Sequence, residues 1–503
     1  MRCCNIKKIL KILVLLILLV VYIFLVNGQT THDLYIAHKM NPPPSKINRF
    51  DLNSFSIVST LSINNIAELR EIDINNNNLY SVTEFGQIIK ITLNNFPNFP
   101  AQIAYLGPGY DGLHFVSITP NGQYLLTATV ANPSSVTNQK IVKINTNNLQ
   151  LVGQTLLPAS YQIIDAVIDP IGQYLYAGTY ETPGKILKIR LSDMVLVGVI
   201  TISNQYSRLF HVAEIEEDGQ YAYFGTTGTS TQPARIVRIR LSDFTHQGTL
   251  LLGTNRDLGC VTIDNVNNKL YLGTVFDGTY PSAYSYVIKV DLNTFTEITP
   301  PYPILSGGNQ EFHSCMYDEK NNKVIFASRI GSPGPSRIVR VNSLPLAQDT
   351  WTFISNTYEA IGTMINYKSP SIIIPPGTAS LGFTFNIVLS DEAHPNRPYA
   401  LALSLGNSPG FIMPGGLLVN LATDAIFWAS IDLISPGSPS QTLNGLLVNS
   451  IGYLNNQGTA TAQLTIPNNP SLSGLTVYGA FIVTDFSKTV ALSVSPTVSF
   501  TIT

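Results

Sequence analysis

Short runs of alternating hydrophobic and polar residues dominate the chain after residue 30, and turns rich in Gly, Asn, Asp and Pro separate them. Alternation places successive side chains on opposite faces of the backbone, which is typical of half-buried β-strands. A helical segment would instead repeat its apolar residues every three or four positions, and no such period appears in the sequence. The pattern predicts an all-β protein.

One phrase recurs about every fifty residues between residues 30 and 367. It reads NNLYSVT, NGQYLLTAT, IGQYLYAGT, DGQYAYFGT, NNKLYLGT and NNKVIFAS, starting at residues 77, 121, 171, 218, 267 and 321. An alternating strand such as DAVIDP precedes each phrase, and a strand that mixes basic and apolar residues, such as KILKIRL, follows it. A fourth strand closes the unit. Four short strands at a fixed period predict a β-propeller blade.

Seven blades are expected. Six units begin near Leu69, Phe115, Asp165, Val212, Cys260 and Ser314, whereas residues 33–61 hold only the last three strands of a unit. Residues 359–367, EAIGTMINY, look like an innermost strand. We expect this segment to pair with the 33–61 segment and close the propeller over residues 30–367, because closure removes the open edges at the two ends.

These units resemble the YVTN-type propeller repeats of secreted and surface proteins. The resemblance rests on the turns TPNGQ, DPIGQ and EEDGQ, on the LYAGT-like strands and on the IVKI-like strands that follow them. It implies a seven-bladed propeller, and since such repeats serve many functions it implies architecture more than activity.

The remaining residues, 368–503, open with the linker-like KSPSIIIPPGT and contain alternating runs such as FTFNIVL, YALALSL and TAQLTI. Such runs predict a β-sandwich. The phrases PYALALSLG, IPNNPSLSGLTVYGAFIV and SFTIT resemble a C-terminal module of exported bacterial proteins. That resemblance implies an accessory, adhesive or surface-retention role.

Composition and the N-terminus narrow the partners and the location. Charged residues make up 12% of the chain and the formal net charge is −2, which argues against nucleic acid as a partner. Arg2, Lys7, Lys8 and Lys11 precede an apolar run over residues 12–26, so residues 1–28 are predicted to be a signal peptide or an uncleaved signal anchor. The chain is expected to be secreted or held at the cell surface; the alternative is a single-pass membrane protein whose membrane contact is limited to this segment.

The candidate site comes from aligning the blades. The alignment places His114, His211 and His313 at one position, immediately before the innermost strand, with Glu68 at that position in the second blade. Asp111, Arg208, Arg256 and Gln310 fall three residues earlier in their blades, and Asp257 adjoins Arg256. We expect these side chains to border the mouth of the central channel.

Three interpretations of this cluster stay open. Imidazoles suit a transition metal, so the three histidines are candidate metal ligands. The arginines suit a carboxylate or sugar acid, which makes the six other residues candidate ligand-binding groups. A purely structural role, with each ring bonded to the backbone of a neighbouring blade, is the third. The expected cofactor is accordingly none or a transition metal.

Binding is favoured over catalysis, and no catalytic residue is assigned. The sequence contains no HExxH element, no Gly-rich nucleotide loop and no Ser-His-Asp spacing. The loops between second and third strands are long and varied, as in FDGTYPSAYSY, and such loops commonly carry recognition. We expect an exported recognition or adhesion protein that binds a saccharide, a peptide or a surface component. The alternatives are a metal-binding protein or a lactonase-, lyase- or isomerase-like enzyme, and a structural surface-layer component.

The mature chain has two cysteines, Cys260 and Cys315, on neighbouring innermost strands. Aligning the two units on NNKLY and NNKVI offsets them by one residue, so they should point to opposite faces of their sheets. Two free, buried thiols are therefore predicted.

Overall fold

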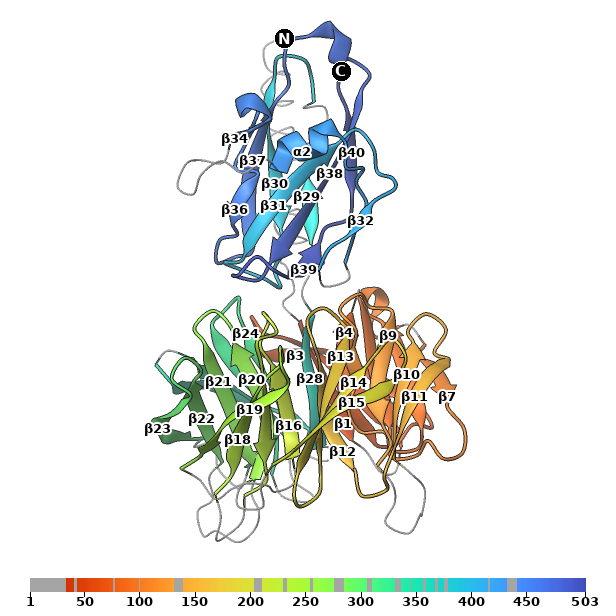
Figure 1. The fold of residues 1–503 in the computed structure, drawn as a ribbon. Helices are drawn as coiled ribbons and strands as arrows, with labels where there is room; N and C mark the ends of the chain where they lie inside the picture. The colour runs from red at the N-terminus through yellow and green to blue at the C-terminus, as the bar shows by residue number, and fades with distance from the viewer. Residues whose placement is uncertain are drawn as a thin grey trace, which may run out of the picture.

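The computed structural model describes residues 33–39, 43–75, 77–98, 100–130, 139–202, 210–228, 233–253, 257–275, 285–304, 310–330, 336–343, 345–355, 359–366, 370–374, 379–414, 417–431 and 441–503. The predicted signal segment lies outside these residues. Among the residues described, no helix is both long enough and apolar enough to cross a membrane. Figure 1 shows a propeller with a second, all-β unit standing on one of its two faces.

Residues 33–366, where described, form seven four-stranded antiparallel sheets arranged as blades, which confirms the predicted seven-bladed propeller (Figure 1). The first three blades, innermost strand first, are β28 (Glu359–Asn366), β1 (Asp33–Lys39), β2 (Ser45–Asp51) and β3 (Ser56–Ile63); β4 (Leu69–Asn75), β5 (Asn78–Thr83), β6 (Gln87–Thr92) and β7 (Gln102–Tyr105); and β8 (Ser117–Ile118), β9 (Tyr124–Ala128), β10 (Gln139–Asn145) and β11 (Leu151–Leu157). A short 3-10 helix, η1 (Leu93–Asn95), follows β6.

The other four blades repeat this order with full-length innermost strands. They are β12 (Ile163–Ile168), β13 (Tyr174–Thr179), β14 (Lys185–Arg190) and β15 (Val195–Thr201); β16 (Phe210–Ile215), β17 (Tyr221–Thr226), β18 (Arg235–Arg240) and β19 (Thr245–Leu251); β20 (Asp257–Asp264), β21 (Lys269–Val275), β22 (Tyr286–Asp291) and β23 (Thr296–Pro303); and β24 (Gln310–Asp318), β25 (Lys323–Ile330), β26 (Ser336–Asn342) and β27 (Ala347–Ser355).

The first blade is built from both ends of the propeller sequence. Strand β28 pairs antiparallel with β1, with Leu34 opposite Ile365 and Ala37 opposite Gly362. Strand β28 also lies next to the innermost strands of the blades on either side, β24 and β4. Residues more than 300 positions apart therefore share one sheet, and the ring of blades is continuous.

The repeat carries Lys or Arg in its third strands because these side chains contact the neighbouring blade. Lys143 Nζ donates to the backbone carbonyl of Leu191 in the next blade at 2.8 Å, and Lys289 Nζ donates to that of Ser343 at 2.9 Å. Arg340 Nη1 of the seventh blade donates to the carbonyl of Leu52 in the first blade at 2.9 Å. These side chains tie consecutive blades together, so the repeated cations are structural.

The glycine of the LYAGT-like phrase lets neighbouring blades approach closely. A Cβ atom on Gly178 would lie 2.6 Å from Cβ of Phe210 in the next blade, and one on Gly273 would lie 2.7 Å from Cβ of Phe312. Such distances are too short for any side chain, so the face of one blade packs directly against the innermost strand of the next.

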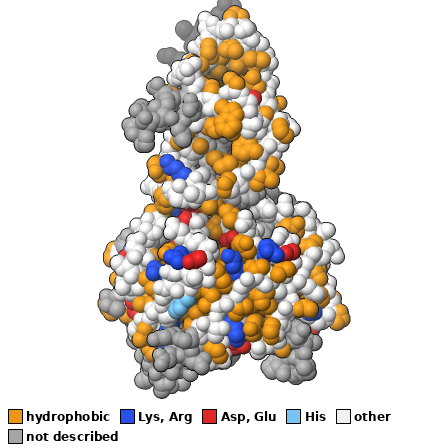
Figure 2. Space-filling view, in the orientation of Figure 1, with side chains coloured by type: hydrophobic (Ala, Val, Ile, Leu, Met, Phe, Trp, Pro, Cys, Tyr) orange, Lys and Arg blue, Asp and Glu red, His pale blue; other side chains and the backbone are white. Residues whose placement is uncertain are grey.

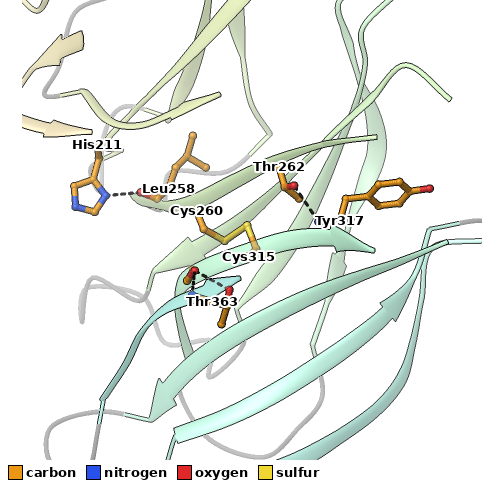
Figure 3. Close-up of a disulfide and its surroundings, with 8 residues drawn as sticks. His211, Leu258, Cys260, Thr262, Cys315, Tyr317 and Thr363 are labelled. Carbon is orange, nitrogen blue, oxygen red and sulfur yellow. Dashed lines mark hydrogen bonds between the residues drawn. A yellow bond between two sulfur atoms is a disulfide. The ribbon is translucent and has the colours of Figure 1, made fainter. Parts of the chain in front are cut away.

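Cys260 and Cys315 form a disulfide, which makes the prediction of free thiols wrong (Figure 3). The one-residue offset itself is correct, since Cys260 pairs with Gly273 in its sheet and Cys315 pairs with Phe326. The thiols meet because they belong to different sheets: each blade stacks one face on the opposite face of the next. Opposite-facing positions on neighbouring innermost strands are thus brought together, with Cα atoms 5.7 Å apart.

The C-terminal part is a β-sandwich, which confirms the predicted second unit. Its first sheet has the order β29 (Ser371–Ile373), β30 (Thr384–Ser390), β37 (Thr459–Thr465), β35 (Leu447–Val448) and β34 (Gln441–Thr442). Its second sheet contains β36 (Ile451–Tyr453), β31 (Pro398–Ser404), β38 (Thr476–Thr484), β39 (Ala491–Val494) and β40 (Val498–Thr501). Side chains of both sheets, including Leu389, Leu464, Leu401 and Phe481, share one core.

Short elements cover the edges of this sandwich. They are the hairpin of β32 (Phe411–Ile412) and β33 (Leu418–Val419), the helix α2 (Ala425–Ile431), and the 3-10 helices η2 (Leu443–Gly445) and η3 (Pro470–Leu472). Helix α2 buries Phe427 and Ser430 and leaves Trp428 exposed.

An ion-pair cluster joins the sandwich to the propeller. The fully buried Arg397 donates from Nε to Glu217 Oε1 at 2.8 Å and from Nη2 to Glu319 Oε1 at 2.9 Å. Lys320 pairs with Glu392 of the sandwich at 3.3 Å. Glu217 and Glu319 follow the ends of innermost strands β16 and β24, so the sandwich stands on the propeller face where the innermost strands end.

Candidate functional site

The central channel holds a cavity of about 520 Å³. Side chains from the innermost strands of the blades line it, among them His114, His211 and His313. The three predicted histidines therefore share one cavity. They lie where the innermost strands begin, which is the propeller face opposite the sandwich.

A recurrent β-bulge turns these side chains toward the channel. In β16 the register shifts between Phe210 and Val212, which leaves His211 as the extra residue. In β24 the same shift between Phe312 and Ser314 leaves His313 extra, and in β12 the shift spans Ile164 and Asp165. A bulged residue is released from the strand's alternation and can be aimed at a site. The bulge thus adds a channel-facing residue near the start of each of these strands.

His211 is held as a neutral ring. Its Nδ1 lies 2.9 Å from the carbonyl oxygen of Leu258 in the next blade (Figure 3). A carbonyl only accepts, so Nδ1 carries the proton and Nε2 presents a lone pair. Burial lowers the pKa of His211, and the nearby His313 lowers it further. The ring is therefore an acceptor at neutral pH.

His313 contacts a carboxylate of its own strand, because its Nε2 lies 3.2 Å from Glu311 Oε2. Tyr180 approaches the site from the fourth blade, with its ring centre 6.4 Å from that of His211. Burial raises the pKa of Tyr180, and Asp257 raises it further. Glu311 and Tyr180 therefore lie beside the histidines at the channel mouth.

Carboxyl groups line the channel beyond the histidines, and sequence reasoning did not assign them. Asp165 accepts hydrogen bonds from the backbone amides of Ala213 at 2.7 Å and Ala166 at 2.8 Å. Burial raises its pKa to about 7, although these amides favour the charged form. Burial likewise raises the pKa of Glu214 to about 8, with a further contribution from Asp165. Both groups exchange protons near neutral pH.

Glu71 completes this group of carboxyls in the cavity wall. Burial raises the pKa of Glu71 well above its ordinary value, and Asp165 raises it further. Glu71 and Glu214 occupy one repeat position, three residues after Glu68 and His211. A glutamate at the same repeat position of two innermost strands is the signal that could have identified them.

Hydroxyl groups occupy the wall on the other side, near the disulfide. Ser314 Oγ accepts from the amide of Thr363 at 3.0 Å and lies 2.8 Å from Thr363 Oγ1, while Thr262 Oγ1 accepts from the amide of Tyr317 at 3.0 Å (Figure 3). Each bond joins neighbouring innermost strands, so these hydroxyls stabilise the ring as well as lining the cavity.

The structure describes only part of the set of six predicted ligand-binding residues. Glu68 is half-buried, with φ of 55°, and Asp111 is exposed; neither is among the residues that line the cavity. Asp257 begins β20 opposite Val275. Arg208 and Arg256 lie outside the described residues, and Gln310 is described only as part of the β24 backbone.

The predicted metal site gains no support from this geometry. Within the described part of the chain, no group of three or more His, Cys, Asp or Glu side chains is close enough together to hold a metal ion.

Buried carboxyls of the innermost strands make stability depend on pH. Burial raises the pKa of Asp73 to about 6, that of Asp165 to about 7 and that of Glu214 to about 8. The folded chain therefore binds protons that the unfolded chain releases, so this stabilisation is complete below about pH 4 and is lost as pH rises through 6 to 8. Two buried histidines have the opposite effect on stability. Burial lowers the pKa of His38 to about 3 and also lowers that of His211, so both favour unfolding as pH falls below about 6.5.

We therefore expect the melting temperature to be higher at pH 5.5 than at pH 8. One pKa unit corresponds to about 1.4 kcal/mol, or about 2 °C for a domain of more than 300 residues. Calorimetry between pH 5 and 8 measures the shift, and the variant Glu214→Gln should show a smaller one. A melting temperature that falls steadily on acidification over this range would contradict the assignment.

Known proteins resemble the chain in fold. No protein-family model matches the chain, and no curated protein matches it. The solved structure of a putative 6-phosphogluconolactonase from Bacteroides fragilis is 13% identical, with a TM-score of 0.51 over 67% of this chain and 98% of that chain. Dihydro-heme d1 dehydrogenase NirN, solved in complex with DHE, is 10% identical, with a TM-score of 0.46 over 66% of this chain and 75% of that chain. At 13% identity the first likeness shows the propeller fold alone, and the YVTN-type resemblance stays a prediction.

Proposed function

We propose that the chain is an exported recognition protein whose channel mouth binds a neutral, hydroxyl-rich ligand such as the end of a saccharide. One observation carries the proposal: three histidines and the carboxyls of Glu71, Asp165 and Glu214 line the same cavity of about 520 Å³. That volume lies within the range of small-molecule sites, about 300–1,000 Å³.

The chemistry of the lining matches hydroxyl groups, which both donate and accept. His211 Nε2 offers an acceptor, since Nδ1 carries the proton. Carboxyls with pKa values of about 7 and 8, as in Asp165 and Glu214, are populated in both states near neutral pH and can accept or donate. A ligand without matching hydroxyls would leave these enclosed groups unpaired, which is how polar sites discriminate.

The charges in the wall argue against an anionic ligand. Among the described residues that line the cavity, Arg70 is paired with Glu84, and the other charged residues are the acidic Glu71, Asp165, Glu214 and Glu319. A carboxylate or phosphate would meet these carboxyls, so a sugar acid is disfavoured. The likeness to a putative lactonase therefore adds no argument for catalysis on a phosphorylated substrate.

Two features support export. Residues 12–26 form an apolar run behind four basic residues. The disulfide between Cys260 and Cys315 fits an oxidising compartment outside the cytosol.

A saccharide array probed with the chain starting at Gln29 identifies a ligand, and calorimetry then measures its affinity. We expect His211→Phe to weaken binding at least tenfold, because it removes a hydrogen bond worth about 1.5 kcal/mol. We expect Glu214→Gln to weaken binding about fivefold, because the amide replaces a charge-assisted hydrogen bond with a neutral one that is about 1 kcal/mol weaker. The matched control is Glu216→Gln. Glu216 is a glutamate two residues further along, outside the cavity lining and bonded to Tyr223 at 2.6 Å.

The control should bind within twofold of the parent chain. Failure of every saccharide to bind, or equal losses in Glu214→Gln and Glu216→Gln, would overturn the proposal.

A further inference from the structure

A second cavity, of about 800 Å³, lies in the C-terminal sandwich. It opens where strands end: Leu405 follows β31, Ile466 follows β37, Ile502 follows β40, and Leu475 precedes β38. In the described part of the sandwich, the two sheets have no paired strands beyond these points to fill the space between them. Apolar side chains that belong to the sandwich core, such as Leu464, therefore border a void at this end.

Helix α2 forms part of the wall instead of filling it. Its buried Phe427 packs into a separate cluster with Val419 and Leu421, while Ile426 and Ala429 line the cavity. Figure 2 shows hydrophobic side chains gathered over the sandwich face on which Figure 1 labels α2. Trp428 on this helix is 60% exposed. An aromatic reporter therefore sits next to the cavity wall.

The lining has one chemical character. Among the described residues that line the cavity none is charged, and Asn444 supplies the one polar side chain. Leu405 and Leu475 are 48% and 39% exposed, so the opening is apolar as well. Native interiors are close-packed, and a cavity walled by apolar groups holds water poorly while accepting apolar ligands.

We propose that this cavity binds an aliphatic chain, such as the alkyl tail of a lipid-like molecule. The wall offers no partner for a charged or strongly polar group, so the tail lies among Leu464, Ile466 and Val477 and the polar head stays in solvent beyond Leu405 and Leu475. Affinity then depends on the alkyl chain and little on the head group. This site is independent of the channel and of any ligand bound there.

Binding of 1-decanol to the full chain starting at Gln29 tests the proposal, with Trp428 fluorescence and calorimetry as readouts. We expect saturable binding of one decanol per chain, and decylamine should bind within a few-fold of it. Ala429→Phe fills the cavity and should weaken binding at least tenfold. The matched control, Ala425→Phe, changes an exposed residue of the same helix that does not line the cavity and should leave binding within twofold.

A second pair of variants guards against misfolding of Ala429→Phe. Leu475→Asp places a charge at the opening and should also weaken binding at least tenfold, whereas Leu418→Asp, exposed and outside the lining, should not. Decanol binding that does not saturate, or equal losses in a variant and its control, would overturn the proposal. So would a parent chain that is dimeric until Leu475→Asp makes it monomeric, because a second copy would then occupy the opening.

Discussion

A chain that lacks residues 30–61 should fail to form a cooperatively folded propeller. The deletion removes β1, β2 and most of β3 and leaves β28 without its partner strand in the first blade. It also removes Leu34, Ile36 and Phe50 from the core shared with the seventh blade, and Tyr35 from the core shared with the second. Burying each such side chain contributes about 1.5–3 kcal/mol, so the loss approaches the 5–15 kcal/mol that stabilise a typical domain.

The matched control starts at Gln29 and keeps residues 30–61. Thermal unfolding followed by circular dichroism should show a sharp transition for the control and a broad one at much lower temperature, or none, for the deletion. Equal melting temperatures and equal cooperativity would show that the ring does not depend on the shared blade.

Replacing Arg397 by leucine should uncouple the sandwich from the propeller. Its guanidinium group bonds both Glu217 and Glu319 and lies 4.4 Å from the ring centre of Phe486. Burial already raises the pKa of Glu319 to about 7 although Arg397 opposes the shift. Removing one partner of a buried ion pair costs about 3–5 kcal/mol because the remaining charges stay uncompensated.

The destabilisation caused by Arg397→Leu cannot exceed the free energy that docks the sandwich on the propeller, since the two units can separate. We therefore expect calorimetry to resolve two transitions and proteases to cleave faster around residue 368. Arg190→Leu is the control: its pair with Asp193 is exposed, and such pairs contribute up to about 1 kcal/mol. A triple variant with Glu217→Leu and Glu319→Leu added should recover docking, because the two carboxylates that Arg397 neutralises are then removed as well. Unchanged unfolding of Arg397→Leu would contradict this role.

The repeat made the propeller predictable, because each blade repeats the same local pattern and closure requires a seventh innermost strand. The bulges were not predictable in the same way. The bulges lie at or before the first residues of DAVIDP and VAEIEE, so the alternation within these segments gives no sign of them. Asp165 and Glu214 were therefore assigned to strands without a functional role. The three histidines were found because their repeat position stood out in the alignment.

Features that depend on how separate strands, blades and domains pack together could not be predicted from the sequence. The disulfide follows from the stacking of opposite blade faces, which a strand alignment within one sheet does not represent. Arg397 meets Glu217 and Glu319 across 180 and 78 residues, with no local pattern to mark any of the three. The cavity of the sandwich depends on where four strands end, and strand ends are the least certain part of any sequence-based assignment.

A crystal structure of the chain with the best saccharide from the array would show whether the channel mouth binds a hydroxyl-rich ligand. We expect ligand density in the channel cavity, with ligand oxygens within hydrogen-bonding distance of His211 Nε2 and of the Glu214 or Asp165 carboxyl. Density on the outer strands of the blades or on the sandwich, with the channel cavity free of ligand, would contradict it.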